Sequence, residues 1–97
     1  MSKKIYSADV QPPKNLRVRF FTTHKNATGK EKLQDVSNQV AKIIIEDLED
    51  ESGACMLLRF DNQDKLVWKT RHASLKETKW HLEFEYGLQD DKLLPIV

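Results

Sequence analysis

The stretch Lys79-Trp-His-Leu-Glu-Phe-Glu-Tyr-Gly87 alternates between apolar and polar residues. The apolar members are Trp80, Leu82, Phe84 and Tyr86, and the polar members are Lys79, His81, Glu83 and Glu85. A period of two residues is typical of a strand that buries one side and turns the other to solvent. We therefore predict a strand over residues 79–86, with Trp80 in the core and His81 on the opposite side.

Two earlier segments alternate in the same way and are separated by a turn-like sequence. Residues 54–60 and 65–71 flank Asp61-Asn-Gln-Asp64, whose residue types are common in tight turns. They predict a hairpin in which Phe60 faces Leu66, because this register places apolar side chains beside each other. Together with the last strand they form a predicted three-stranded meander.

The first half of the chain contains one more alternating segment, residues 16–23, and a short candidate partner strand, residues 5–10. After them the apolar spacing changes to three and four, which is typical of an amphipathic helix. The residues on this stripe are Leu33, Val36, Val40, Ile43, Ile44 and Leu48. Thr28-Gly-Lys-Glu31 has the form of a capping box and Gly53 is a typical helix stop, so we predict a helix between them.

These segments predict an α+β fold in which one α-helix packs across a four- to five-stranded antiparallel sheet, in the order (β)βαβββ, as a two-layer sandwich. A chain of 97 residues is long enough for one domain, residues 1–97, and we expect mobile ends over residues 1–4 and 88–97. Cys55 is the only cysteine, which excludes an intrachain disulfide, and no apolar run is long enough to cross a bilayer. We therefore expect a cytoplasmic protein without a membrane partner.

Charge is distributed unevenly along the chain. Residues 1–45 carry nine Lys or Arg against three Asp or Glu, and residues 46–97 carry seven against twelve, although the net charge is only +1. Such a split favours charged partners if folding keeps the two halves of the surface apart.

With the even-numbered strand residues assigned to the core, the odd-numbered side of the sheet becomes an open face that is basic around an apolar centre. The predicted partner-binding residues on this sheet face are Arg17, Arg19, Phe21, Leu57, Arg59, Val67, Lys69, Arg71, Lys79 and His81. An apolar centre inside a charged rim is typical of a protein-binding surface. The alternative is an ordinary solvated sheet face, on which the Lys and Arg stems shield the strands.

A second candidate surface is acidic and lies at the end of the predicted helix. Its residues are Glu46, Asp47, Glu49, Asp50 and Glu51. A run of this kind either keeps a helix end solvated or meets a basic partner. Its spacing does not match a calcium-binding loop.

The sequence gives little support for catalysis or metal binding. His24, His72, His81 and Cys55 are of the types that bind zinc, but none stands in a CxxC or HxxxH pair. Cys55 and His81 are predicted on strands that a third strand separates, roughly 10 Å apart, which is too far for a Cys-His catalytic pair. We therefore expect no enzyme activity, no cofactor and no metal.

These patterns favour a small non-enzymatic binding module that docks on another protein, as inhibitors, immunity proteins and assembly subunits do. The docking surface would be the basic-rimmed sheet face, the acidic helix end or both. Two alternatives stay open: a nucleic-acid-binding protein that uses the basic sheet face, and a homo-oligomeric structural subunit. The apolar tail, residues 93–97, either packs on its own chain or adds a strand to a partner.

Overall fold

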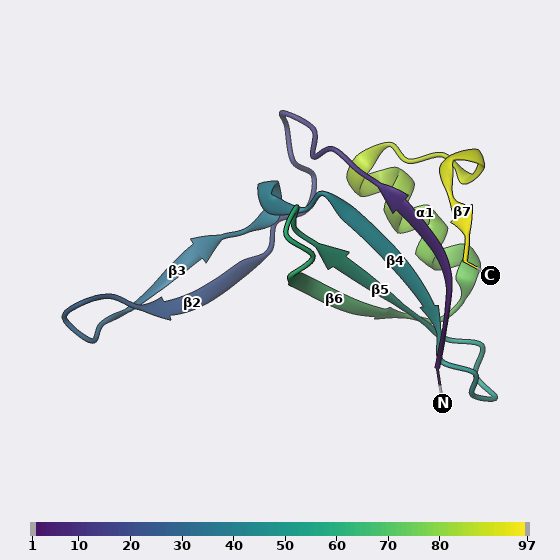
Figure 1. Ribbon diagram of the computed structural model, residues 1–97, viewed down its shortest axis with the longest axis horizontal. Helices are drawn as coiled ribbons and strands as arrows, with labels where there is room; N and C mark the ends of the chain where they lie inside the picture. The colour runs from purple at the N-terminus through teal and green to yellow at the C-terminus, as the bar shows by residue number, and fades with distance from the viewer. Residues whose placement is uncertain (1, 97) are drawn as a thin grey trace.

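A computed structural model describes residues 2–96 of the chain and shows one helix packed on a five-stranded antiparallel sheet (Figure 1). The strands are β1 (Lys3–Asp9), β2 (Phe21–Lys25), β3 (Glu31–Asp35), β4 (Lys42–Asp47), β5 (Cys55–Phe60), β6 (Leu66–His72) and β7 (Leu94–Pro95). The helix is α1 (Leu75–Tyr86), and two short 3-10 turns span Ser37–Gln39 and Asp90–Lys92. The order in the sheet is β6-β5-β4-β1-β7, and β2 and β3 form a separate two-stranded hairpin. The predicted α+β class is confirmed.

The position of the helix in the chain differs from the prediction. Helix α1 occupies the segment that was predicted as the last strand. The Ser74 side chain accepts a hydrogen bond from the Glu77 amide at 3.1 Å, and Gly87 ends the helix with a left-handed φ of 66°. This capping box and glycine stop specify a helix locally, although the apolar residues between them alternate.

The segment predicted as a helix contains the central strand of the sheet instead. Ile43, Ile44 and Ile45 are all buried in β4, which pairs with β1 on one side and β5 on the other. Consecutive β-branched residues suit a central strand of a sheet, and they mimic a helical stripe when only their spacing is considered. The predicted helix start lies in the turn between β2 and β3, where the Asn26 side chain accepts hydrogen bonds from the amides of Thr28 and Lys30, both at 3.0 Å.

The hairpin of β5 and β6 follows the prediction at its turn and departs from it one residue later. Phe60 pairs with Leu66 as expected, but an irregularity at this point pairs Arg59 with Trp68. The extra residue, Val67, is half-buried and packs against the core. A bulge of this kind exchanges the two sides of a strand. Trp68 consequently lies on the helix side of the sheet, with Arg59 as its neighbour.

The helix covers the odd-numbered side of β5, opposite to the predicted assignment. The buried residues of β4, β5 and β6 on this covered face are Ile43, Ile45, Cys55, Leu57, Arg59 and His72. Leu82 of α1 packs into the same cluster and is 1% exposed. Met56, Leu58 and Phe60, which were predicted to form the core layer, are half-buried on the other side of the sheet. Both sides of β5 carry mainly apolar residues, so the sequence pattern of this strand does not reveal which side the helix covers.

The β2–β3 hairpin projects from the body of the molecule as an arm (Figure 1), and the molecule measures 46 × 31 × 22 Å. The base of the arm is fixed by a hydrogen bond from the Val36 amide to the Phe20 carbonyl at 2.9 Å and by an ion pair between Arg19 and Asp35 at 2.7 Å. Phe20 stacks on Trp68 with 5.6 Å between ring centroids, which attaches the arm to the sheet. The strand predicted over residues 16–23 therefore begins only at Phe21.

The apolar tail packs on its own chain over the residues that the structure describes. Leu93 is buried, β7 pairs with β1, and the Ile96 amide donates to the Ile5 carbonyl at 2.9 Å. Val97 lies outside the described residues. The single α-helix of residues 2–96 is too short and too polar to cross a lipid bilayer.

Candidate functional site

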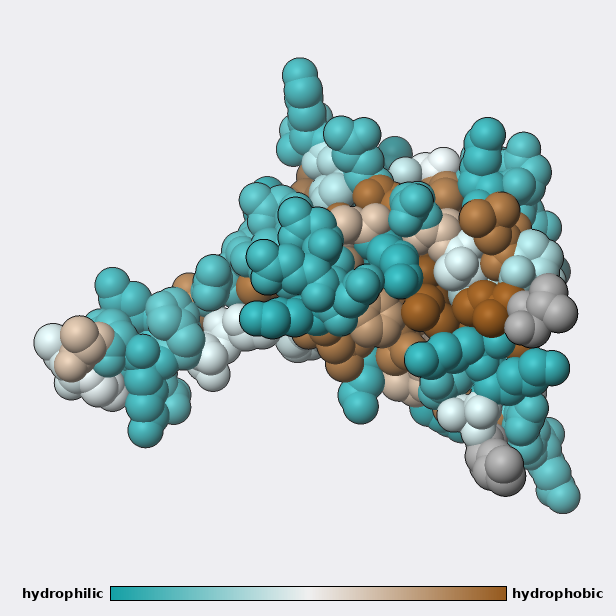
Figure 2. Space-filling model, in the orientation of Figure 1, coloured by the Kyte–Doolittle hydropathy of each residue, from teal (hydrophilic) through white to brown (hydrophobic). Residues whose placement is uncertain are grey.

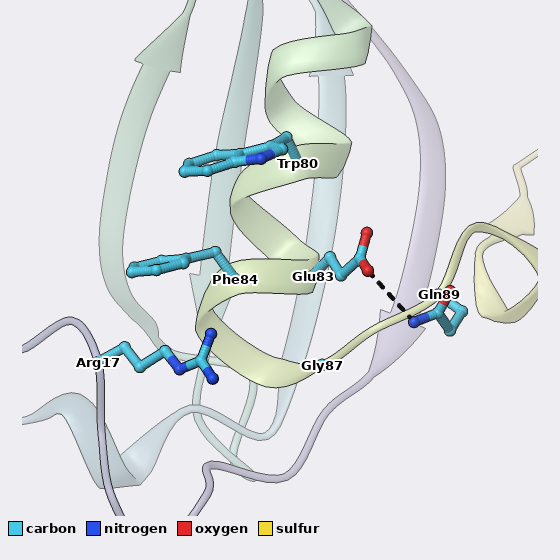
Figure 3. A pocket seen from close by; sticks show the side chains of 6 residues that line it. All are labelled: Arg17, Trp80, Glu83, Phe84, Gly87 and Gln89. Atoms are coloured by element: carbon cyan, nitrogen blue, oxygen red, sulfur yellow. Dashed lines mark hydrogen bonds between the residues drawn. The ribbon is translucent and has the colours of Figure 1, made fainter.

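Two aromatic side chains stand on the outer face of α1, exposed to solvent (Figure 3). Trp80 is 58% exposed and Phe84 is 36% exposed. Their rings are nearly parallel, with 5.3 Å between centroids and 6° between planes. Residues at positions i and i+4 lie on the same side of a helix, so this stacked pair follows directly from the spacing of the two residues. The structure thus corrects the prediction that Trp80 lies in the core.

The aromatic rings are outside because the opposite side of the helix is occupied by smaller and more polar residues. Thr78, Leu82 and Glu85 are the buried residues of α1, at 0%, 1% and 4% exposure. Thr78 donates its hydroxyl to the Ser74 carbonyl at 2.8 Å, which satisfies this buried donor within the helix. The helix therefore buries two polar residues beside Leu82 while two of its aromatic residues face solvent, which departs from the usual amphipathic pattern.

The aromatic pair forms part of a shallow hollow of about 360 Å³ between the C-terminal end of α1 and the coil that contains Arg17 (Figure 3). The hollow is lined by Arg17, Trp80, Glu83, Phe84, Gly87 and Gln89. The Arg17 guanidinium carbon lies 5.3 Å from the centre of the Phe84 ring, within the range of a cation-π contact. Within residues 2–96 Arg17 forms no ion pair, so its positive charge is available to a ligand.

A network of charged and polar residues lies beneath the helix. Arg59 donates to both carboxylate oxygens of Glu85, at 3.1 and 2.9 Å, and its remaining nitrogen donates to the Thr70 hydroxyl at 3.1 Å. Arg59 is 1% exposed and Glu85 is 4% exposed. The Arg59 guanidinium also lies 4.5 Å from the centre of the Phe20 ring. Arg59 was predicted as a partner-binding residue, but its position makes it a structural link between β5, β6 and α1.

The network continues to two histidines, His72 at the end of β6 and His81 on α1. Thr70 Oγ1 lies 2.7 Å from His72 Nε2, and the rings of His72 and His81 are 4.3 Å apart between centroids. Burial lowers the pKa of His72, and the nearby His81 and Arg59 lower it further, while Glu77 opposes them. His72, Glu77 and His81 are also the three side chains of residues 2–96 that are placed to bind a metal ion together.

Two other reactive groups are buried and have no catalytic geometry. The Cys55 thiol is 2% exposed, and burial raises its pKa, with a smaller contribution from Asp47. The Tyr86 hydroxyl is buried without a hydrogen-bond partner in residues 2–96, and burial raises its pKa to about 12. Both groups are therefore protonated near neutral pH, which is unfavourable for a nucleophile.

The residues predicted for the sheet face are dispersed by the fold. Lys69 and Arg71 are exposed on the open side of β6, as expected. Leu57 and Arg59 are buried beneath the helix, and Val67 packs against the core. Four of the others lie on the coil and the arm or on α1: Arg17, Arg19 and Phe21 precede or begin the arm, and Lys79 is on the helix. His81 also lies on α1, so the prediction that it faces outward from a strand is wrong.

An open sheet face of the expected kind exists, but other residues form it. Its apolar centre consists of Ile44, Met56, Leu58 and Phe60, in neighbouring positions of β4 and β5. Around this centre the register places Lys4, Asp9, Lys42, Glu46, Lys69 and Arg71. The rim is basic in balance, as predicted. Of its apolar centre, Ile44 is only 9% exposed and the other three side chains are half-buried, while Leu66, which pairs with Phe60 at the edge of this face, is 50% exposed.

The acidic residues lie on a strand end and a loop instead of a helix end. Glu46 and Asp47 end β4, and Glu49, Asp50 and Glu51 follow in the connection to β5. Asp50 is 3.8 Å from Arg71, and hydrogen bonds from Ser52, more than Arg71, lower its pKa.

The sequence contained signals for the residues that the prediction missed. Ser74-Leu-Lys-Glu77 has the capping-box spacing, and Gly87 is a typical helix stop. The segment between Ser74 and Gly87 has the length of an ordinary helix. On a helix, Glu77 and His81 are one turn apart, and so are Trp80 and Phe84. Recognition of the cap would therefore have placed Trp80 next to Phe84, and Glu77 next to His81, on the surface of one helix.

Comparison with known proteins finds no protein-family model that matches this chain, no matching curated protein and no matching solved structure.

Proposed function

We propose that this protein is a binding module that docks on another protein through the outer face of α1. The observation that carries this proposal is the exposed stack of Trp80 on Phe84 beside the hollow at Arg17. The proposal keeps the protein-binding function that the sequence favoured and moves the docking surface from the sheet to the helix. Leu57 and Arg59, which the sheet-face hypothesis required, are buried beneath the helix and are not accessible to a partner.

Exposed aromatic rings of this size favour a binding role because burial in a partner would be strongly favourable. Trp and Arg are the residue types most enriched among those that dominate the free energy of protein association. A Trp side chain has only two rotatable torsions and the Arg guanidinium is a planar fork, so the ordering of these contacting groups on binding loses comparatively little conformational entropy. Here the Trp80 ring is already held by Phe84, and the Arg17 guanidinium is already close to the Phe84 face.

The charges around the hollow suggest what a partner would present. An apolar side chain would fill the space beside Trp80, and a carboxylate would pair with Arg17, which has no ion pair within residues 2–96. Glu83 receives a long hydrogen bond of 3.5 Å from Gln89 and lies on the other side of the hollow. We therefore expect a partner segment that combines apolar and acidic residues. The lining includes no nucleophile with an adjacent base, and we propose no catalytic step at this site.

The proposal is tested by comparing capture of partners from the native source with three forms of the protein. These are the wild type, a Trp80→Ala, Phe84→Ala variant, and a Leu33→Ser control that removes an exposed apolar residue from the distant arm. A specific partner should be retained by the wild type and the control and lost from the double variant. With a purified partner, Trp80→Ala alone should weaken binding at least about tenfold, because central aromatic residues commonly contribute more than 1.4 kcal/mol. Unchanged affinity would contradict the proposal.

A second candidate function, nucleic-acid binding, is favoured by the projecting arm rather than by the sheet. The arm carries Lys25, Lys30 and Lys32 near its tip, and Figure 2 shows mainly hydrophilic side chains along it while brown apolar side chains gather on the body. A two-stranded ribbon has the width to enter a major groove. If the arm binds phosphates, a Lys25→Gln, Lys32→Gln variant should bind duplex DNA more weakly with a shallower salt dependence. Equal binding by this variant and the wild type would exclude the arm.

A further inference from the structure

Three metal-binding residue types meet where β6 ends and α1 begins. His72 is the last residue of β6, and Glu77 and His81 lie one turn apart on α1. One ligand atom from each residue lies within 4.8 Å of those of the other two. The connection between strand and helix is only two residues long and Ser74 caps the helix, so the backbone holds the group together.

The distances are compatible with a bound transition-metal ion after small side-chain rotations. Bonds of about 2.0–2.1 Å to a tetrahedral zinc ion place its ligand atoms about 3.3–3.4 Å apart. The present separations therefore need to shorten by about 1.5 Å at most. Glu77 is 49% exposed and His81 is 33% exposed, which leaves both side chains free to make this adjustment. His72 is 6% exposed and serves as the fixed ligand.

The surroundings of both histidines resemble the outer shell of a metal site. Nε2 of His72 lies 2.7 Å from Thr70 Oγ1, and Thr70 in turn accepts a hydrogen bond from Arg59. In the tautomer in which Nε2 carries the proton and donates to Thr70, the lone pair of Nδ1 is free on the side of Glu77, 3.9 Å away. On the other histidine, Nδ1 of His81 faces a Glu85 carboxylate oxygen at 4.0 Å. Metal-binding histidines usually direct their second nitrogen at such a hydroxyl, carbonyl or carboxylate group.

A single buried residue organises both halves of this outer shell. Arg59 holds the Thr70 hydroxyl with one nitrogen and the Glu85 carboxylate with two others. These two groups face His72 and His81 respectively. A buried arginine that fixes the orientation of two separate histidine neighbours is a costly arrangement, and binding of a common ion gives it a purpose.

We propose that His72, Glu77 and His81 form a binding site for a divalent transition-metal ion, with Zn²⁺ as the best match. Two imidazoles and one carboxylate are a common ligand set for zinc sites that keep a fourth position open, whereas Mg²⁺ and Ca²⁺ prefer oxygen ligands alone. The exposure of Glu77 directs the open position toward solvent, where water completes the coordination. The ion would join the end of β6 to the start of α1. This inference is independent of the proposed partner-binding function, since it uses none of the residues of the hollow.

The test is a titration of tag-free, chelator-treated protein with Zn²⁺ by isothermal calorimetry, accompanied by Co²⁺ absorption spectra. His81→Phe keeps an aromatic ring beside His72 and Trp80 but removes the ligand, and Glu77→Gln removes the charge. His24→Gln is the matched control, because His24 lies on the exposed arm. His72 is left unchanged because it is buried, and the fold of every variant is checked by circular dichroism.

The wild type and His24→Gln should bind one Zn²⁺ per chain with equal affinity, and each ligand variant should bind at least about tenfold more weakly. Co²⁺ should give visible bands of a four-coordinate site in the first two proteins only. Zn²⁺ should also raise the melting temperature of these two proteins, because an ion that binds only the folded state stabilises it. The proposal is overturned if the wild type shows no saturable binding, if His81→Phe and Glu77→Gln bind as tightly as the wild type, or if His24→Gln loses affinity. A histidine pair that only packs together would give the first of these results.

Discussion

Arg59 and Glu85 form a two-pronged ion pair beneath the helix, with N···O distances of 3.1 and 2.9 Å and almost no exposure to solvent. The pair joins the second strand of the β4–β5–β6 meander to the helix that follows it. Both charges are desolvated, so each depends on the other. The fold of this protein is consequently sensitive to changes that remove one member alone.

Replacement of Glu85 by Ala should destabilise the protein by about 3–5 kcal/mol, because Arg59 would remain buried without its partner. An Arg59→Met, Glu85→Leu double variant should recover most of this loss, since no charge stays buried. Urea denaturation of the single and double variants measures both effects. Arg71→Gln, which removes an exposed ion pair with Asp50, should change stability by only about 0–1 kcal/mol. A similar loss in Arg71→Gln and Glu85→Ala would contradict the assignment of the buried pair.

Trp80→Ala should have a small effect on stability despite the size of the side chain. The ring is 58% exposed, and it contacts Phe84 by stacking and His81 by an edge contact, aromatic pairs worth about 0.5–1.5 kcal/mol each. Leu82→Ala, two residues along the same helix and 1% exposed, should cost about 2–5 kcal/mol. Chemical denaturation of the two variants makes the comparison. If Trp80→Ala proved the more damaging, the outward orientation of the aromatic pair would be wrong.

Tyr86→Phe should leave stability unchanged or increase it by up to about 1–3 kcal/mol, because the buried hydroxyl has no hydrogen-bond partner in residues 2–96. The pKa of Tyr86 is raised to about 12 in the folded protein, above the value of about 10 for an unfolded chain. The folded state therefore retains the proton more strongly, and wild-type stability should fall as the pH rises from about 10 toward 12. Urea denaturation across this range, compared between wild type and Tyr86→Phe, isolates the contribution. Parallel pH profiles for the two proteins would argue against it.

The arm should remain anchored in moderately acidic solution. Hydrogen bonds from Ser37 and then from Arg19 lower the pKa of Asp35 to about 2, below the value of about 3.9 for an unfolded chain. The stabilisation is therefore complete above about pH 4 and is lost as the pH falls toward 2. The chemical shift of the Asp35 carboxyl carbon reports this titration, and Asp35→Asn should speed amide exchange in the arm at neutral pH. Asp64→Asn, which removes an exposed contact with Lys42, is the control and should leave exchange in the arm unchanged.

The sequence predicts the composition of this fold better than the placement of its parts. Capping signals and turn residues are local, so the β5–β6 hairpin could be located from Asp61 and its neighbours. In the structure, hydrogen bonds between Asp61, Asp64 and Lys65 close this turn. The three consecutive isoleucines of β4 are ambiguous, because a buried strand and a helix stripe both accept them. The helix was hidden for a related reason: it buries Thr78 and Glu85 and exposes Trp80 and Phe84. The burial of Glu85 is explained only by its ion pair with Arg59, which lies on β5 beneath the helix.

The candidate sites show the same limit. The structure has an open sheet face with a basic rim, but the bulge at Val67 and the inverted side of β5 mean that other residues than the predicted ones form it. The histidine group could not be found by motif spacing alone, since His72 lies on a strand while Glu77 and His81 lie on a helix. Sites assembled from different elements depend on the angle at which the elements meet, and a single sequence does not contain that angle.

The position of β1 has a consequence for how the chain reaches its final form. β1 is the first strand along the chain, yet it lies between β4 and β7, which are both distant in sequence. The hairpins of β4, β5 and β6 and the adjoining helix are local in sequence and can form early, because closing short loops loses little entropy. The pairing of β1 with β4 and with β7 forms only when segments that are remote in the sequence come together. We therefore expect a polarised folding transition state with an ordered β4–β5–β6 meander, in which substitutions in β1 accelerate unfolding while leaving the folding rate nearly unchanged.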